Sequence, residues 1–184
     1  MEILETLLFS LSLCLPVVME MRRAADASSI KSLQGLGISL AASVIQIALV
    51  LGGLFLGKAL RFEPAEMCGT IALALLVVVA VKMFITSLSK KERPGYDLSK
   101  TATVLALCVA LAINTFITGI ALGMSTDNMK TTTITAAVSV AVFGLLFSEI
   151  GVMLGRQKKT IREKRHWIVA LLLYLAAIAW HVAF

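Results

Sequence analysis

The sequence predicts an all-α integral membrane protein with six transmembrane helices, arranged as two inverted three-helix repeats. Composition is the first reason: 59% of the 184 residues are hydrophobic and 15% are charged, whereas soluble domains contain about 45–50% apolar residues. The second is a mean hydropathy of +0.93. The third is a repeated pattern, because Gly53–Lys58 and Gly151–Arg156 both read Gly-x-x-x-Gly followed by a basic residue.

Six apolar stretches are each long enough to cross a hydrocarbon core, which takes about 20 helical residues. They cover roughly residues 3–20, 34–57, 67–89, 102–123, 132–155 and 166–184. The first stretch starts with Glu2 and Glu5 instead of a basic region, and no small-residue cleavage site follows it. We therefore expect it to be a retained helix and not a cleaved signal peptide.

The turn-forming residues Glu92–Asp97 mark the connection between the two halves. The predicted division is a first three-helix repeat at 1–92, a cytoplasmic linker at 93–101 and a second three-helix repeat at 102–184. Each half has an odd number of crossings, so the second half inserts upside down relative to the first. Inverted repeats of this kind are common in secondary transporters.

The distribution of positive charge predicts the orientation. Of the 17 Lys and Arg residues, thirteen follow the first, third and fifth stretches, while Lys58, Arg61 and Lys130 lie on the other side. The positive-inside rule places the basic connections in the cytoplasm and both termini outside the plasma (cytoplasmic, in bacteria inner) membrane. The +6 net charge is thus a topology signal, with membrane lipid as the expected partner and no nucleic acid. The cluster from Arg156 to Arg165 is also of the kind that binds anionic headgroups.

Two ionisable side chains are predicted well inside the apolar stretches, Lys82 in the third and Glu149 in the fifth. With this topology both lie ~10 Å from the cytoplasmic ends of their helices. Charges at this depth need a partner or water, and the equal depth permits an ion pair. Such a pair is either a fixed strut between helices or a gate or proton-coupling pair.

Uncharged polar residues near mid-membrane are candidates for a transport path. Gln46, Asn114 and Thr118 can donate and accept hydrogen bonds, and hydrogen bonding between helices is the alternative role. Pro16 leaves the carbonyl of Ser12 without its helical donor. This segment is predicted to be either cavity-lining backbone or a packed kink.

The remaining reactive side chains indicate no enzyme and no cofactor. The three cysteines are widely spaced and form no readable disulfide or metal motif. His166 and His181 lie near opposite ends of the sixth stretch without a metal-ligand partner at helical spacing. No nucleophile and base pair can be assembled from these residues.

Three segments resemble the MntP-type manganese efflux pumps of bacteria, a family related to the lysine-exporter superfamily. Phe147–Arg156 is similar to the family's apolar-Ser-x-x-Gly-x-x-x-Gly-Arg run in its fifth helix, and Ala80–Met83 to Gly-Gly-Lys/Arg-Met in its third helix. Gln46 stands where the family carries Gln or Glu. The resemblance covers nearly the whole chain and implies a fold of two inverted three-helix halves.

The chain resembles a divergent member of this family, because both aspartates of the family motif are replaced. The motif places Asp after Ser-x in the first helix and again in the fourth, where this chain has Cys14 and Asn114. Mn²⁺ prefers carboxylate, carbonyl and water ligands, so the metal ligands stay unknown. Cys14 would suit a softer metal such as Zn²⁺ or Cu⁺, although a single intramembrane Cys is more often a small hydrophobe.

The resemblance implies a secondary transporter that exports a cation, Mn²⁺ or another divalent metal, by alternating access. The residues predicted for its transport path are Cys14, Gln46, Asn114 and Thr118, and those for its gate or coupling pair are Lys82 and Glu149. Two alternatives remain open. The chain exports a different small solute, or it is a non-transporting scaffold or regulatory paralogue that binds a partner through its helix faces or basic connection.

Overall fold

A computed structural model describes residues 2–28, 32–62, 65–88, 101–157 and 163–183. Each of the six predicted stretches lies largely within one helix, and all six helices are long and apolar enough to span a membrane. The six-helix prediction is therefore confirmed. The helices are α1 (Glu2–Asp26), α2 (Ser32–Ala59), α3 (Ala65–Leu88), α4 (Thr101–Ser125), α5 (Met129–Arg156) and α6 (Glu163–Ala183).

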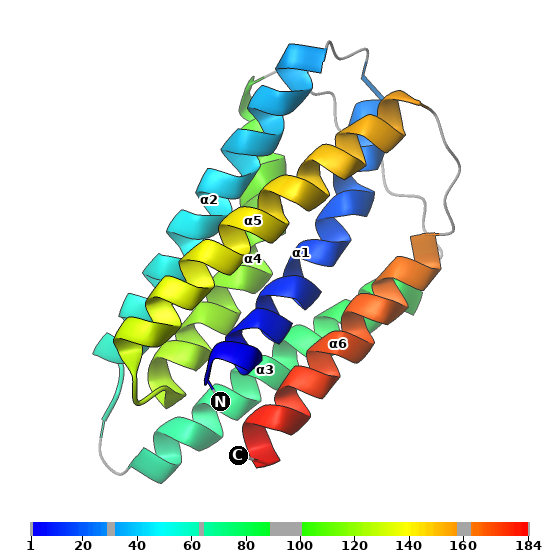
Figure 1. The fold of residues 1–184 in the computed structure, drawn as a ribbon. Coiled ribbons are helices and arrows are strands. Elements are labelled where there is room, and N and C mark those ends of the chain that lie inside the picture. The colour runs from blue at the N-terminus through cyan, green and yellow to red at the C-terminus, as the bar shows by residue number, and fades with distance from the viewer. Residues whose placement is uncertain (1, 29–31, 63–64, 89–100, 158–162, 184) are drawn as a thin grey trace.

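The helices run alternately up and down, so both ends of the chain lie at the same end of the bundle (Figure 1). We call this the termini end. The opposite end, where α1, α3 and α5 finish, is called the basic end after the Lys- and Arg-rich connections that follow these helices. Residues 93–100 of the linker predicted at 93–101 fall outside the described residues, as does most of the connection from α5 to α6, and Thr101 begins α4.

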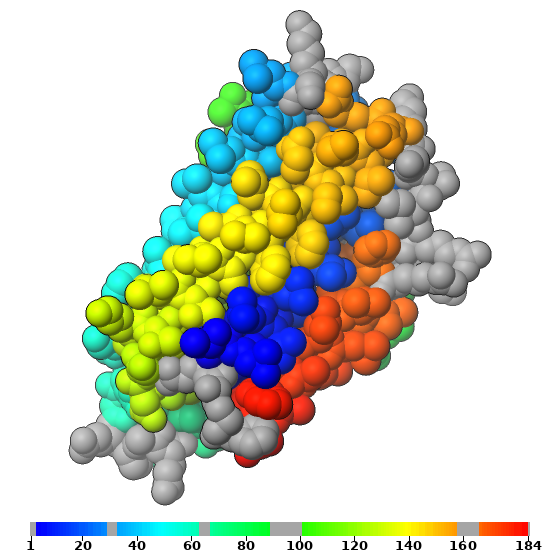
Figure 2. All heavy atoms as spheres, in the orientation of Figure 1, coloured from blue at the N-terminus to red at the C-terminus, as the bar shows by residue number. Residues whose placement is uncertain are grey.

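The helix contacts show a regular pattern. α1 packs most closely on α5, and α2 on α4, while α2 also contacts α5 and α3 contacts α6. α1 also contacts α6, and α4 also contacts α3. Figure 2 shows α5 lying across the front face between α2 and α1. If α1, α2 and α3 are exchanged with α4, α5 and α6, this set of helix contacts stays the same, as expected for two related halves. The inverted repeat and its boundaries stay a prediction.

The two Gly-x-x-x-Gly patterns make the closest helix contacts in equivalent ways. In each half, two glycines one turn apart face carbonyl oxygens of a helix from the other half. Adding 98 to the number of each glycine in α2 gives the equivalent glycine in α5, and adding 98 to each carbonyl residue in α1 gives the equivalent residue in α4. Ser43 and its hydrogen-bond acceptor Ala141 are also 98 residues apart. The four contacts are Gly53 to Phe116, Gly57 to Ile120, Gly151 to Val18 and Gly155 to Arg22.

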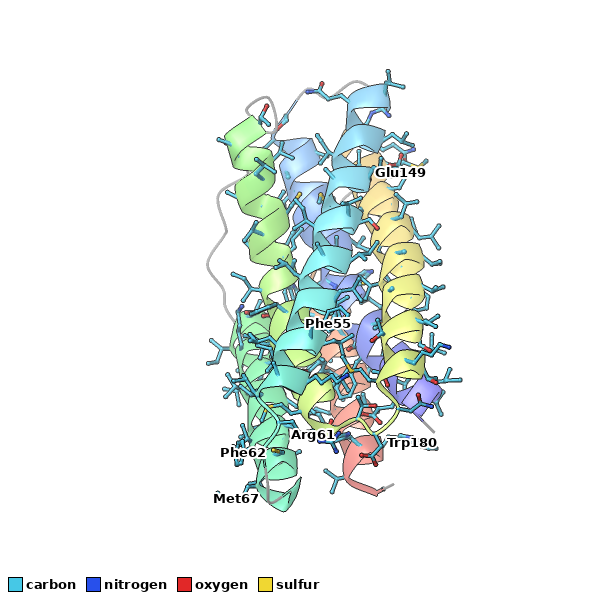
Figure 3. The ribbon with its side chains drawn as sticks, turned by 90° about the vertical axis from the view of Figure 1, so that its left-hand side faces the viewer. Phe55, Arg61, Phe62, Met67, Glu149 and Trp180 are labelled. Carbon is cyan, nitrogen blue, oxygen red and sulfur yellow. The ribbon has the colours of Figure 1, made fainter. Side chains whose placement is uncertain are left out.

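At the termini end, polar contacts join connections and helix ends from the two halves. Arg61 donates hydrogen bonds to the Thr126 carbonyl at 3.0 Å and to Asp127 Oδ1 at 2.9 Å, so it links the two short turns (Figure 3). Glu5 Oε1 and His181 Nδ1 lie 2.7 Å apart. The start of α1 is thereby attached to the end of α6.

Adding one methyl group at Gly57 tests how much the bundle depends on these contacts. A Cβ there would collide with the Ile120 carbonyl and with the Gly123 Cα. We expect Gly57→Ala to lower the free energy of unfolding by about 1–3 kcal/mol, measured by thermal unfolding in detergent. Gly37→Ala on the same helix is the control, because a Cβ at Gly37 meets nothing within 4 Å. Equal stability of the two variants would contradict the prediction.

Candidate functional site

A cavity of about 280 Å³ lies between α1, α3, α4 and α6. One face of α1 lines it, because Leu13, Pro16 and Glu20 follow one another at helical spacing. α1 continues through Pro16 without a break, and the Pro16 region does line a cavity, as one of the two sequence interpretations predicted. Leu107 and Trp167 complete the wall nearer the basic end. We call this space the four-helix cavity.

Lys82 and Asn114 meet in the wall of the four-helix cavity. The Lys82 ammonium donates a hydrogen bond to Asn114 Oδ1 at 2.6 Å, and both side chains line the cavity together with Thr86. α3 supplies the ammonium and α4 the amide. This hydrogen bond joins α3 to α4 at the cavity wall.

Glu20 also lines the cavity, and sequence reasoning missed it. The predicted first stretch ended at residue 20, but α1 continues to Asp26, which places Glu20 six residues, or about 9 Å, inside the helix end. Its side chain is only 6% exposed, and Arg23 lies one turn on with Nη1 3.4 Å from Glu20 Oε1. The signal in the sequence that could have identified Glu20 is its position four residues after Pro16, which places both residues on the same face of a continuous helix.

On the termini side of the cavity, buried side chains from the same four helices pack together. The Tyr174 hydroxyl lies 2.8 Å from Thr118 Oγ1 in a hydrogen bond, and the Tyr174 ring packs edge-on against Phe9 with centroids 5.1 Å apart. With Leu76, these residues are each at most 1% exposed. We call these four residues the floor. Thr118, predicted for the transport path, therefore belongs to the floor and not to the cavity lining.

Cys14 and Gln46 lie on the other side of α1 from the cavity. Cys14 Sγ donates to Gln46 Oε1 at 3.7 Å, both residues are almost fully buried, and Gly144 leaves room for the Gln46 amide. Among the described residues, Gln46 Nε2 has no hydrogen-bond partner, nor do the buried hydroxyls of Ser39 and Ser148. The predicted path residues are thus divided, with Asn114 in the cavity and Cys14 beside Gln46. Their roles in transport stay predictions.

Lys82 and Glu149 are not brought together. α3 packs mainly on α4 and α6, whereas α5 packs mainly on α1 and α2. Glu149 lies on α5 toward the basic end (Figure 3), and its buried Oε2 has no hydrogen-bond partner within the part of the chain that the structure describes. The predicted depth puts both residues at a similar level along the bundle. Depth alone does not say which helices are neighbours, and α3 and α5 pack mainly on different helices. A gate or coupling role for either one stays a prediction.

The four-helix cavity has charged and polar side chains in its wall, but they form no metal centre by themselves. Within the described part of the chain, no three His, Cys, Asp or Glu side chains lie together so that they could hold a metal ion. The polar side-chain groups of the residues that line the cavity are one carboxylate, one ammonium, one amide, one hydroxyl and one indole N–H. Oxygen donors of this type suit hard cations that keep part of their water.

Residues 29–181 match a protein family described as "Putative manganese efflux pump". This range contains five of the six helices. The chain belongs to this family. No curated protein and no solved structure matches it.

The manganese efflux pump match begins after α1, so the first motif position and Glu20 lie outside the matched residues. The second motif position, Asn114, lies inside them. The structure thus separates the two motif positions in space: Asn114 contacts Lys82 in the cavity, and Cys14 contacts Gln46 behind α1. Of the two, Asn114 is the one that a solute in the four-helix cavity can reach.

The hydrogen bond that crosses the floor should be measurable as a coupling energy. Tyr174→Phe and Thr118→Val each remove one partner and keep most of the packing. We expect a double-mutant cycle on unfolding in detergent to give about 1 kcal/mol of coupling between them. Ser125→Ala is the control partner for Tyr174→Phe, because the Ser125 hydroxyl bonds to its own helix. Additive effects of Tyr174→Phe and Thr118→Val would contradict the contact.

Proposed function

We propose that this protein is a secondary transporter that exports a small cation across the plasma membrane, with Mn²⁺ as the substrate that its family suggests. The family match over residues 29–181 is the observation that carries the proposal. The four-helix cavity, with Glu20 and Asn114 in its wall, supports it as the place where a solute would be held. Transport, and not catalysis, is also the activity that the family description names.

The proposed mechanism is alternating access between two inverted halves. Support comes from the contacts that are equivalent after a shift of 98 residues. The buried residues of the floor lie on the termini side of the cavity, and the positive-inside rule assigns the basic end to the cytoplasm, with both termini extracytoplasmic. In this orientation the cavity lies in the cytoplasmic half of the membrane, where an exporter takes up its substrate.

The loss of both motif aspartates keeps a second candidate open. With Cys14 and Asn114 at these positions, and without a cluster of metal ligands among the described residues, export of a different small solute or a non-transporting regulatory role is the competing proposal. A direct measurement of metal content separates the candidates.

Expression in manganese-sensitive cells tests cation export. We expect the wild type to restore growth in Mn²⁺ and to lower intracellular manganese, measured by mass spectrometry together with other divalent metals. Asn114→Ala should lose most of this effect, because it removes the oxygen that holds Lys82. The control is Ala106→Ser, an exposed position on the same helix that is absent from the cavity wall. An unchanged content of every metal in wild-type cells would contradict cation export and favour the competing proposal, which is export of a different small solute or a non-transporting role.

Restoring one acidic residue should improve transport. Asn114→Asp would place a carboxylate beside the Lys82 ammonium and make the cavity more negative by one charge. We expect a faster initial rate of Mn²⁺ movement in inverted membrane vesicles, by up to about tenfold, with Asn114→Leu as the uncharged control. Cys14→Asp should instead destabilise the bundle, because it buries a carboxylate at a position that is 0% exposed. A rate for Asn114→Asp no higher than wild type would contradict this view.

A further inference from the structure

We infer that this protein changes conformation by moving two rigid bodies against each other, and that each body contains helices from both halves of the sequence. The first, called the α1 body, consists of α1, α5 and α6. The second, called the α2 body, consists of α2, α3 and α4. The bodies meet at the α2–α5 interface, which opens when they move. The inference rests on the proposed alternating access, because it names the parts that move in that cycle.

Backbone contact at glycine joins the two central helices of each body. A Cβ at Gly151 of α5 would collide with the Val18 carbonyl of α1, and a Cβ at Gly53 of α2 would collide with the Phe116 carbonyl of α4. Packing this close has discrete arrangements and does not deform gradually. We therefore expect α1 to move together with α5, and α2 together with α4.

Each of the two remaining helices is attached to one of these pairs. α6 packs more extensively on α1 than on α3, and α3 packs more extensively on α4 than on α6. The ring contact between Phe9 and Tyr174 joins α1 to α6, and the hydrogen bond between Lys82 and Asn114 joins α3 to α4. If α1, α2 and α3 are exchanged with α4, α5 and α6, each body becomes the other, as a cycle with two equivalent states requires.

The α2–α5 interface has a register that two contacts define. A Cβ at Gly35 of α2 would lie 2.7 Å from Val152 Cγ1 of α5. A Cβ at Gly144 of α5 would lie 3.5 Å from Ser43 Oγ of α2. These contacts are eight residues apart on each of the two helices. The positions halfway between them, one helical turn from either contact, therefore face each other across the interface.

Ser39 and Ser148 occupy these halfway positions. Both are 0% exposed, and within the described residues neither hydroxyl has a hydrogen-bond partner. Gln46 Nε2 on α2 and Glu149 Oε2 on α5 are buried without a partner there as well. Buried polar groups normally form hydrogen bonds, as the hydroxyl of Ser12 does with its own helix. Four such atoms on two neighbouring helices favour a second state in which water reaches them.

Hydrogen bonds between the bodies lie near mid-membrane and on the termini side. Ser43 of α2 bonds to a carbonyl of α5 at 3.2 Å, and Cys14 of α1 bonds to an amide of α2 at 3.7 Å, all near the midpoints of their helices. In the floor, Thr118 of the α2 body bonds to Tyr174 of the α1 body. The two halfway serines lie nearer the basic end, so we expect α2 and α5 to part there.

The four-helix cavity lies on the boundary between the same two bodies. Leu13 and Trp167 of the α1 body line one side, and Met83 and Leu107 of the α2 body line the other. A movement of the bodies consequently changes the width of the cavity and the packing of the α2–α5 interface together. Opening of this interface is thus a report on the transport cycle at a distance from the solute.

Alkylation of introduced cysteines in the purified full-length protein tests whether the interface opens. Ser39→Cys and Ser148→Cys each place a thiol there, which N-ethylmaleimide labels when the two helices part. Ser139→Cys is the matched control, because Ser139 is also a buried serine of α5 but bonds to Ser10 inside the α1 body. We expect the interface thiols to be labelled at least about tenfold faster than the control. Peptide mass spectrometry identifies the labelled residue and separates it from the native cysteines.

A disulfide across the interface should stop the cycle. In membrane vesicles, the oxidised variant with Ser39→Cys and Ser148→Cys should lose Mn²⁺ export, and reduction should restore it. The control is the variant with Ser10→Cys and Ser139→Cys, whose native hydroxyls are 2.7 Å apart inside the α1 body. Its disulfide joins two helices that move together, so it should keep wild-type export.

Equal labelling of Ser148→Cys and Ser139→Cys, or full export by the variant with a confirmed disulfide between positions 39 and 148, would overturn the inference. If the wild type exports a divalent cation while the interface thiols stay unlabelled, the inference fails and the proposed function stands. If the wild type exports no divalent cation while the interface thiols are labelled faster than the control, cation export fails and the movement of the two bodies stands.

Discussion

Close contact between helix backbones, made possible by glycine, is the constraint on which the rest of this structure depends. Lipid supplies no hydrophobic drive between helices, so they associate through close packing and hydrogen bonds. Here Gly53 and Gly57 bring α2 against α4, and Gly151 and Gly155 bring α5 against α1. α1 and α4 each use one face in these contacts. Their remaining faces meet α6 and α3, and the four-helix cavity forms there.

The number and extent of the helices could be predicted because hydropathy directly reports the length of chain that crosses a membrane. Hydropathy does not give the ends of the helices, and the end of α1 determines whether residues near position 20 lie inside the bundle. The apolar run stops near residue 20, yet the polar residues up to Asp26 continue the helix. Glu20 stands at the last position of the predicted stretch, although its side chain is buried.

The partners of the intramembrane residues could not be predicted from depth alone. Lys82 and Glu149 lie at a similar distance from the basic ends of their helices, but only the packing of α3 on α4 decides that Lys82 meets Asn114. In the same way, Cys14 and Asn114 hold equivalent places in a repeated motif and yet lie in different surroundings. Cys14 and Asn114 are 100 residues apart, whereas the glycine contacts relate α1 to α4 by a shift of 98 residues. By that shift, the residue of α1 equivalent to Asn114 is Pro16.

The 98-residue relation also gives a direction to the proposed transport cycle. Under this relation the counterpart of Glu20 is Thr118, which stands in the floor against Tyr174, and the counterpart of Lys82 is Trp180. An exchange of the two halves would open a cavity on the opposite side, with a hydroxyl where the first cavity has a carboxylate. If the proposed exchange of halves takes place, the two cavities would therefore differ in charge. On that proposal, the divergence of the halves would make the two sides of the membrane chemically unequal.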